Sequence, residues 1–355
     1  MKSYGNLAFC RTRETTPHSP IDTRSVEDVS GPLPQPQSLA SSRRFPLMIR
    51  SFCRPNLPCL ILLFLCALAI APATTARADG TPAVQVITES EVTVPRARQY
   101  DIKSRINGST YRVFVSTPFK AEPGKRYPVL YVIDGNWYFA PASVNATESS
   151  FEVGPVIIVG IGFPTEDNDQ VHQRRFFELT PWPMPDSKPG QSGGGDIYLR
   201  VLEEEIRPFI NAHYAVDPAK QILYGKSLGG LMVLHQMFTH PESYAAYISA
   251  SPSIWFNNSA VLKDEAAFVK RVKDGQLHLR LLLTAAGNEQ YRGPDPVKRA
   301  NDHGRMIDNA LDLADRLAPV DPTRLHVEKV IFSDESHTSV SLAALGRGLY
   351  FGLKP

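Results

Sequence analysis

A serine flanked by glycines lies in the second half of the chain, in the pentapeptide Gly225-Lys226-Ser227-Leu228-Gly229. When a Gly-x-Ser-x-Gly segment joins a strand to a helix, it holds the serine in a strained turn with the hydroxyl exposed at the carboxyl edge of a sheet. A hydroxyl in that position can attack a carbonyl carbon once a base removes its proton. Ser227 is therefore the candidate nucleophile of an acyl-transfer reaction.

The residues around Ser227 are those that such a turn requires. An apolar run precedes it at 222–224, and apolar residues recur at helical spacing over 231–238. A side chain at Gly225 or Gly229 would collide where the strand and helix pass each other. The backbone N–H of Leu228 would face the same side as the hydroxyl and supply one donor of an oxyanion hole. A plain glycine-rich turn, the alternative, explains neither flanking run.

The nucleophile needs a base and an acid to orient the base. His337 stands in a polar loop, 332–339, after the last expected strand, where the order serine, acid, histidine would place it. The acid is expected after the preceding strand, and Glu289 would there accept the second imidazole N–H. A structural histidine and a solvated carboxylate are the alternatives. Two aspartates on the same connection are reserve candidates for the acid, Asp295 and Asp302.

A second oxyanion donor is expected after an early central strand, in the stretch 133–137. A backbone N–H of Asn136 or Trp137 would serve, with Gly135 permitting the turn. The same Asp-Gly pair can also form an ordinary turn.

The elements that position these residues follow from the apolar patterning. Alternating residues at 84–87 and 111–115, with a turn at Asn107-Gly108, predict antiparallel strands at the amino-terminal side. Continuous apolar runs are typical of parallel strands covered on both faces by helices. Such runs and shorter strand-like segments lie at 127–133, 155–161, 221–224, 246–249, 279–284 and 325–332. The pattern predicts one doubly wound α/β domain with a mostly parallel sheet.

Residues 163–195 contain scattered Pro, Gly and Ser and no clear periodicity. Long segments of this kind in compact domains are usually lids or binding loops. A mobile surface loop is the alternative.

The first 78 residues differ from the rest of the chain. Residues 1–47 are rich in Ser, Pro, Thr and Arg and are interpreted as a disordered or mis-started extension. Residues 48–78 combine basic residues, an apolar run and Ala76-Arg77-Ala78, which is the pattern of a signal peptide. The run is short for a membrane span, so no stable span is expected after cleavage. Residues 79–355 would form the mature domain, periplasmic or secreted from a bacterium.

Cysteine and charge usage bound the possible functions of the mature part. All four cysteines precede residue 79, so the mature domain has neither a disulfide nor a cysteine nucleophile. Residues 1–78 hold nine basic and four acidic residues, so the net charge of +2 becomes −3 without them. Basicity therefore gives no case for nucleic-acid binding.

Several motifs together resemble the "putative esterase" family of the α/β hydrolases, which includes esterase D-like proteins and the enterobactin, salmochelin and bacillibactin esterases. The resemblance spans most of the mature domain. It rests on Pro128-Val129-Leu130-Tyr131-Val132-Ile133-Asp134-Gly135-Asn136, Arg175-Phe176-Phe177-Glu178-Leu179-Thr180-Pro181, Gly225-Lys226-Ser227-Leu228-Gly229-Gly230 and Ser251-Pro252-Ser253-Ile254-Trp255.

The resemblance implies an α/β-hydrolase fold, with Ser227 as nucleophile and His337 as base. Lys226 departs from the histidine often seen before this serine. Arg174 and Arg175 sit where such enzymes could meet a substrate anion, which suits a ferric siderophore. An Arg-to-Glu178 structural pair is the alternative, and Trp255 could line an aromatic pocket or belong to the core.

The sequence thus predicts an exported serine ester hydrolase that works through an acyl-enzyme, most like a siderophore trilactone esterase. Its partner would be a small-molecule ester, and the chemistry requires no metal or cofactor. An acyltransferase on the same triad and a non-catalytic ligand-binding protein with the hydrolase fold are the alternatives.

Overall fold

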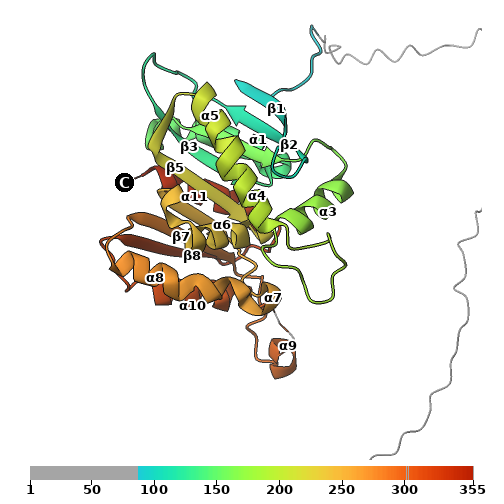
Figure 1. Ribbon diagram of the computed structural model, residues 1–355, viewed down its shortest axis with the longest axis vertical. Coiled ribbons are helices and arrows are strands. Elements are labelled where there is room, and N and C mark those ends of the chain that lie inside the picture. Colours follow the sequence, from blue (N-terminus) through green and yellow to red (C-terminus); the bar gives the residue numbers. More distant parts are fainter. Residues whose placement is uncertain (1–86, 301, 303, 355) are drawn as a thin grey trace, which may run out of the picture. The chain divides into compact units, whose positions relative to one another are not determined.

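The computed structural model describes residues 87–300, 302 and 304–354. Among these residues, eight strands form one sheet in the order β1-β2-β4-β3-β5-β6-β7-β8 (Figure 1). Strands β3 to β8 run parallel to one another, whereas β2 is antiparallel to both β1 and β4. This is the sheet of an α/β-hydrolase fold, in which the carboxyl ends of the parallel strands share one edge.

The strands are β1 (Ala97–Lys103), β2 (Thr110–Ser116), β3 (Tyr127–Ile133), β4 (Ile157–Gly162), β5 (Val216–Lys226), β6 (Ala246–Ala250), β7 (Leu279–Ala286) and β8 (Leu325–Phe332). The α-helices are α1 (Gly135–Glu148), α2 (Ser150–Val153), α3 (Asn168–Glu178), α4 (Gly195–Val201), α5 (Arg207–His213), α6 (Leu228–Thr239), α7 (Phe256–Ser259), α8 (Glu265–Lys273), α9 (Pro296–Ala300), α10 (Met306–Leu317) and α11 (Val340–Leu353). A π-helical turn and two 3-10 turns complete the order: η1 (Leu202–Ile206), η2 (Pro241–Ser243) and η3 (Ala260–Asp264).

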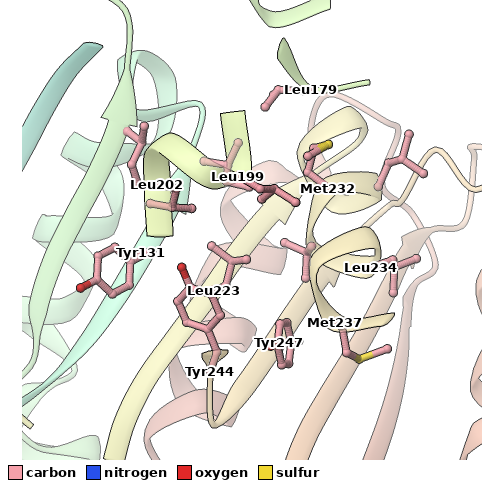
Figure 2. Close-up of a cluster of buried hydrophobic side chains, with 14 of the residues drawn as sticks. Tyr131, Leu179, Leu199, Leu202, Leu223, Met232, Leu234, Met237, Tyr244 and Tyr247 are labelled. Carbon is pink, nitrogen blue, oxygen red and sulfur yellow. The ribbon is translucent and has the colours of Figure 1, made fainter. Parts of the chain in front are cut away.

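Apolar side chains of the parallel strands alternate between two cores, one on each face of the sheet. Leu223 of β5 joins the larger core with residues of α4, η1, α6, α8 and α10, and Figure 2 shows it near Leu199, Leu202 and Met232. Tyr224, the next residue, joins the core that α1 and α11 cover on the other face. Burial on both faces explains why these strands are continuous apolar runs.

The parallel strands confirm the sequence prediction closely, whereas most of the first predicted strand lies outside the described residues. The prediction placed a strand at 84–87; only Ile87 of that stretch lies within the described residues, and it belongs to no strand. β1 instead pairs Lys103 with Thr110 and Ala97 with Ser116. The hairpin turn fixes this register, because the partner of a strand that starts at residue 110 must end shortly before the turn.

The segment 163–195 is not the continuous loop that its sequence suggests, because it contains α3. The Asp167 carboxylate caps this helix and accepts hydrogen bonds from the N–H groups of Asp169 and Gln170. Only Val171 and Glu178 of the helix are buried, so the sequence has no apolar stripe from which the helix could be predicted.

No helix within 87–300, 302 and 304–354 is both long and apolar enough to cross a membrane. The expected extension at 1–47 and the expected signal peptide at 48–78 lie outside the described residues.

Candidate active site

Ser227 lies in the turn between β5 and α6, with φ 60° and ψ −118°. A non-glycine residue pays a steric cost in this backbone region, and such strain is common at functional sites. The close approach predicted at Gly225 is present, because a Cβ there would lie 2.2 Å from the carbonyl oxygen of Gly229. A Cβ at Gly229 would instead meet Asp134 Oδ2 at 3.3 Å. The turn therefore holds the Ser227 hydroxyl at the carboxyl edge of the sheet.

His337 lies beside this hydroxyl, and Glu289 lies on the other side of the His337 ring. His337 Nε2 lies 3.0 Å from Ser227 Oγ, and its Nδ1 lies 2.5 Å from Glu289 Oε1. The histidine belongs to the connection from β8 to α11, and the glutamate follows β7. The structure thus brings together the three residues that the sequence nominated, in a hydrogen-bonded series.

Glu289 is held as an acceptor for the imidazole. Its side chain is only 1% exposed, and Oε2 accepts a hydrogen bond from the Ala286 N–H at 2.8 Å. Burial raises the pKa of the Glu289 carboxyl, but the hydrogen bonds from His337 and Ala286 outweigh burial and leave the pKa below its usual value. The carboxylate is therefore ionised at neutral pH and can orient the ring of His337.

The reserve acids have other contacts. Asp295 Oδ1 accepts the N–H groups of Val297 and Lys298, at the start of α9. Asp302 Oδ2 accepts the N–H of Tyr291. Both carboxylates organise the connection between β7 and α10.

Helices α1 and α6 begin close to each other at the edge that carries Ser227. The N–H of Leu228 belongs to the first turn of α6, where N–H groups have no acceptor within the helix. On the α1 side, the Trp137 N–H donates to the Asp134 carbonyl at 3.0 Å, so that amide is already engaged. The Asn136 side chain is also engaged, since it binds the backbone of Phe163. The Asn136 N–H lies in the first turn of α1, where N–H groups have no acceptor within the helix.

The two arginines of α3 are both paired. Arg174 Nη2 lies 2.6 Å from Glu178 Oε1, which is the Arg-to-Glu178 pair that the sequence left open. Its guanidinium also donates to the Thr110 carbonyl. Arg175 Nε lies 2.8 Å from Asp134 Oδ1, and Nη2 donates to the Lys226 carbonyl at 3.2 Å. Arg175 therefore links α3 to the turn before α1 and to the end of β5, next to Ser227.

The loop after β6 supplies Ser253, which the sequence did not single out as a site residue, and Trp255, which it did. The Ser253 N–H donates to the Ser227 carbonyl at 3.1 Å, and the two hydroxyl oxygens lie 3.5 Å apart. Trp255 follows on the same loop and is 41% exposed. Its ring contacts Phe256, which in turn contacts Phe176 of α3. The signal was available, because polar residues after a parallel strand next to the nucleophile strand lie at the ligand-binding edge of the sheet.

Comparison with known proteins connects this geometry to an activity. The sequence profile of the family described as "Putative esterase" matches residues 104–319, which include the strand-to-helix turn at Ser227. The chain belongs to this family. It is an ester hydrolase of the α/β-hydrolase fold.

Relatives with known activity cover most of the chain. A ferri-bacillibactin esterase of Bacillus subtilis is 31% identical over 293 residues, which are 79% of this chain and 96% of that protein. A siderophore triacetylfusarinine C esterase of Aspergillus fumigatus is 34% identical over 277 residues, which are 73% of this chain and 93% of that protein. Among solved structures, a siderophore hydrolase of Aspergillus nidulans is 31% identical with a TM-score of 0.64, covering 75% of this chain and 98% of that one.

Proposed function

We propose that this member of the esterase family is an exported serine esterase that hydrolyses a siderophore ester through an acyl-enzyme. The observation that carries the proposal is the hydrogen-bonded series from Ser227 Oγ to His337 and on to Glu289. Relatives that hydrolyse ferri-bacillibactin and triacetylfusarinine C support the siderophore substrate.

In the proposed reaction, His337 Nε2 accepts the Ser227 proton while Oγ attacks the ester carbonyl carbon. The N–H groups of Leu228 and Asn136 would stabilise the oxyanion. The tetrahedral intermediate then expels the alcohol, which takes its proton from His337, and leaves an ester on Ser227. A water molecule, deprotonated by His337, attacks this ester and releases the acid. Glu289 keeps the ring in the tautomer that both steps require.

The surroundings of the serine support a substrate that is partly aromatic. Trp255, on the loop whose Ser253 contacts Ser227, is 41% exposed, and Phe176 of α3 is 37% exposed. These surfaces suit stacking against an aryl or acyl group. Arg174 supports substrate binding less well, since its guanidinium is paired with Glu178. Arg175 is paired with Asp134, so it would bind a substrate anion only while it also keeps this ion pair.

The test is turnover of short p-nitrophenyl esters and of a ferric siderophore ester by the purified chain. Ser227→Ala and His337→Ala should each lower kcat by at least about 10⁴-fold, because the nucleophile and base act as a unit. Ser253→Ala is the matched control, since it removes a neighbouring hydroxyl and should retain turnover. Inert wild-type protein that still binds a ferric siderophore would contradict the proposal, as would formation of a new ester rather than free acid when an alcohol is added.

Export is a separate part of the proposal and rests on the pattern at 48–78. Expression of the full chain in a bacterial host should yield a periplasmic or secreted form that begins near Asp79. Intact-mass measurement of that form checks the cleavage. An uncleaved chain retained in the cytoplasm would contradict export and leave the esterase proposal untouched.

A further inference from the structure

Asp134 occupies a strained position between β3 and α1. Its backbone lies in the left-handed region, with φ 61° and ψ 45°, although the residue carries a side chain. Such a conformation costs free energy and persists only where the surrounding structure enforces it. The Asp134 carbonyl accepts the N–H groups of Trp137 and Tyr138, so this residue also starts α1. The position of the Asn136 N–H therefore depends on how Asp134 is held.

The Asp134 side chain is held by Arg175 of α3. Arg175 Nε lies 2.8 Å from Asp134 Oδ1, and the two side chains are 13% and 1% exposed. Solvent screens a buried ion pair only weakly, so the contact holds Asp134 firmly. The carboxylate also lies against the first turn of α6, because a Cβ at Gly229 would lie 3.3 Å from Asp134 Oδ2. Asp134 thus lies between the turn that begins α1 and the turn that begins α6.

The same guanidinium reaches the end of β5. Arg175 Nη2 donates to the Lys226 carbonyl at 3.2 Å. The parallel pairing of β3 with β5 ends at Val132 and Tyr224. Asp134 and Lys226 each lie two residues beyond that point. Past the end of the pairing, the planar guanidinium bridges the two strand exits with N–H groups in a fixed geometry.

The proposed oxyanion donors follow directly from these two strand exits. The Asn136 N–H comes two residues after Asp134, and the Leu228 N–H comes two residues after Lys226. Two donors stabilise one oxyanion only when both lie within hydrogen-bond distance of the same oxygen. A guanidinium that fixes the distance between the strand exits therefore fixes the distance between the donors.

We propose that Arg175 is a positioning residue of the esterase site, whose bridge between Asp134 and Lys226 sets the spacing of the two oxyanion donors. The inference rests on the oxyanion hole of the proposed function. Arg175 then contributes to kcat without touching the substrate. This role replaces the anion-binding role that the sequence suggested for it.

The test is steady-state kinetics on a neutral p-nitrophenyl ester for wild type, Arg175→Met and Arg175→Lys. Displaced donors weaken contacts made only in the transition state, so Arg175→Met should lower kcat by about 10²-fold and leave KM within about threefold. Arg175→Lys should recover less than about tenfold of this loss, because an ammonium lacks the planar fork. An unchanged kcat on the neutral ester, with a raised KM for an anionic ester, would overturn the proposal in favour of substrate binding.

Arg316→Met controls for the loss of an arginine–carboxylate pair. Arg316 Nη2 lies 2.7 Å from Glu265 Oε2 and joins α10 to α8. Its removal should leave kcat within about twofold of wild type. Arg175→Gln repeats the measurement should the Met variant not fold. A lower melting temperature of the Arg175 variant with a wild-type kcat would overturn the proposal in favour of a purely structural role.

A double variant tests whether Arg175 acts through Asp134. Asp134→Ala should lower kcat as Arg175→Met does, because either change breaks the bridge. The variant with both changes should be less than about threefold slower than the slower single variant, since residues that act through one contact are not additive. Additive losses would show that the two residues act separately and would overturn the proposal.

A further measurement separates this inference from the proposed function. NMR spectra of the labelled chain need no substrate. The amide signals of Asn136 and Leu228 should move in Arg175→Met and stay in place in Arg316→Met. If wild type hydrolyses no ester while these signals move, the proposed function fails and the bridge stands. Unmoved signals in an active enzyme would overturn the inference alone.

Discussion

At the scale of single residues, Ser227 and Glu289 are fixed by the fold, Ser227 through its backbone conformation and Glu289 through burial and hydrogen bonds. The backbone of Ser227 has a positive φ that the surrounding turn enforces. Glu289 is almost completely buried, and each of its oxygens accepts a hydrogen bond. A buried carboxylate without such partners would be costly, so its two partners are what allow it to stay ionised.

Replacing Glu289 by Gln tests this role, because the amide has a similar shape and no charge. The imidazole would lose the partner that fixes its tautomer, and kcat should fall by about 10³- to 10⁴-fold. Glu335→Gln changes a loop carboxylate near His337 that bonds Ser339 and should leave kcat within about twofold. Steady-state kinetics on a p-nitrophenyl ester would decide the matter. An active Glu289→Gln enzyme would remove Glu289 from the proposed mechanism.

At the scale of elements, the site depends on the close approach of connections that follow β5, β7 and β8. Gly287, directly after β7, packs against the residue after β8, because a Cβ there would lie 2.0 Å from the Ser333 carbonyl oxygen. The Gly287 N–H also donates to the Phe332 carbonyl. This contact sets the distance between the connection that carries Glu289 and the one that carries His337.

Gly287→Ala should therefore separate these two connections. Overpacking of this kind costs about 1 to 3 kcal/mol of folding free energy, and a displaced His337 should also lower kcat. Gly346→Ala is the matched control, since its Cβ would meet Asn145 at an ordinary 3.6 Å inside α11. Denaturant unfolding and steady-state kinetics on both variants check the prediction. Wild-type behaviour of Gly287→Ala would show that the connections adjust freely.

At the scale of the whole molecule, one buried charge makes global stability depend on pH. Burial lowers the pKa of Lys226 to about 8, whereas an ordinary lysine has a pKa near 10.5. Between these values the unfolded chain binds more protons, so this group makes stability rise with pH. Below pH 8 both states hold the proton, and the buried ammonium is then at its least favourable.

The free energy of unfolding should therefore depend on pH differently in wild type and in Lys226→Met. The free energy of unfolding of wild type should gain on the order of 3 kcal/mol relative to the variant between pH 7 and pH 10.5. Guanidinium unfolding at a series of pH values measures this difference. Parallel curves for the two proteins would show that Lys226 titrates as an exposed lysine does.

Much of this fold is readable from the sequence, for reasons visible in particular elements. β3 has the predicted bounds, 127–133, because polar residues flank a run that the sheet buries, and β8 also has its predicted bounds, 325–332. β1 was not singled out from the sequence, because its segment, Ala97–Lys103, contains few apolar residues. α3 was missed because its burial comes from two residues rather than an apolar stripe.

By itself, the sequence determined the order serine, acid, histidine and the turn that must hold the serine, because glycine spacing and apolar runs act over short distances. Only the tertiary structure decided which groups meet. Ser227 and His337 are 110 residues apart, and they come within 3.0 Å because β5, β7 and β8 end at one edge of the sheet. The tertiary structure also buried Lys226 at the end of β5 and brought Arg175 of α3 against Asp134. Electrostatic balance depends on distances and burial, and these exist only in the folded chain.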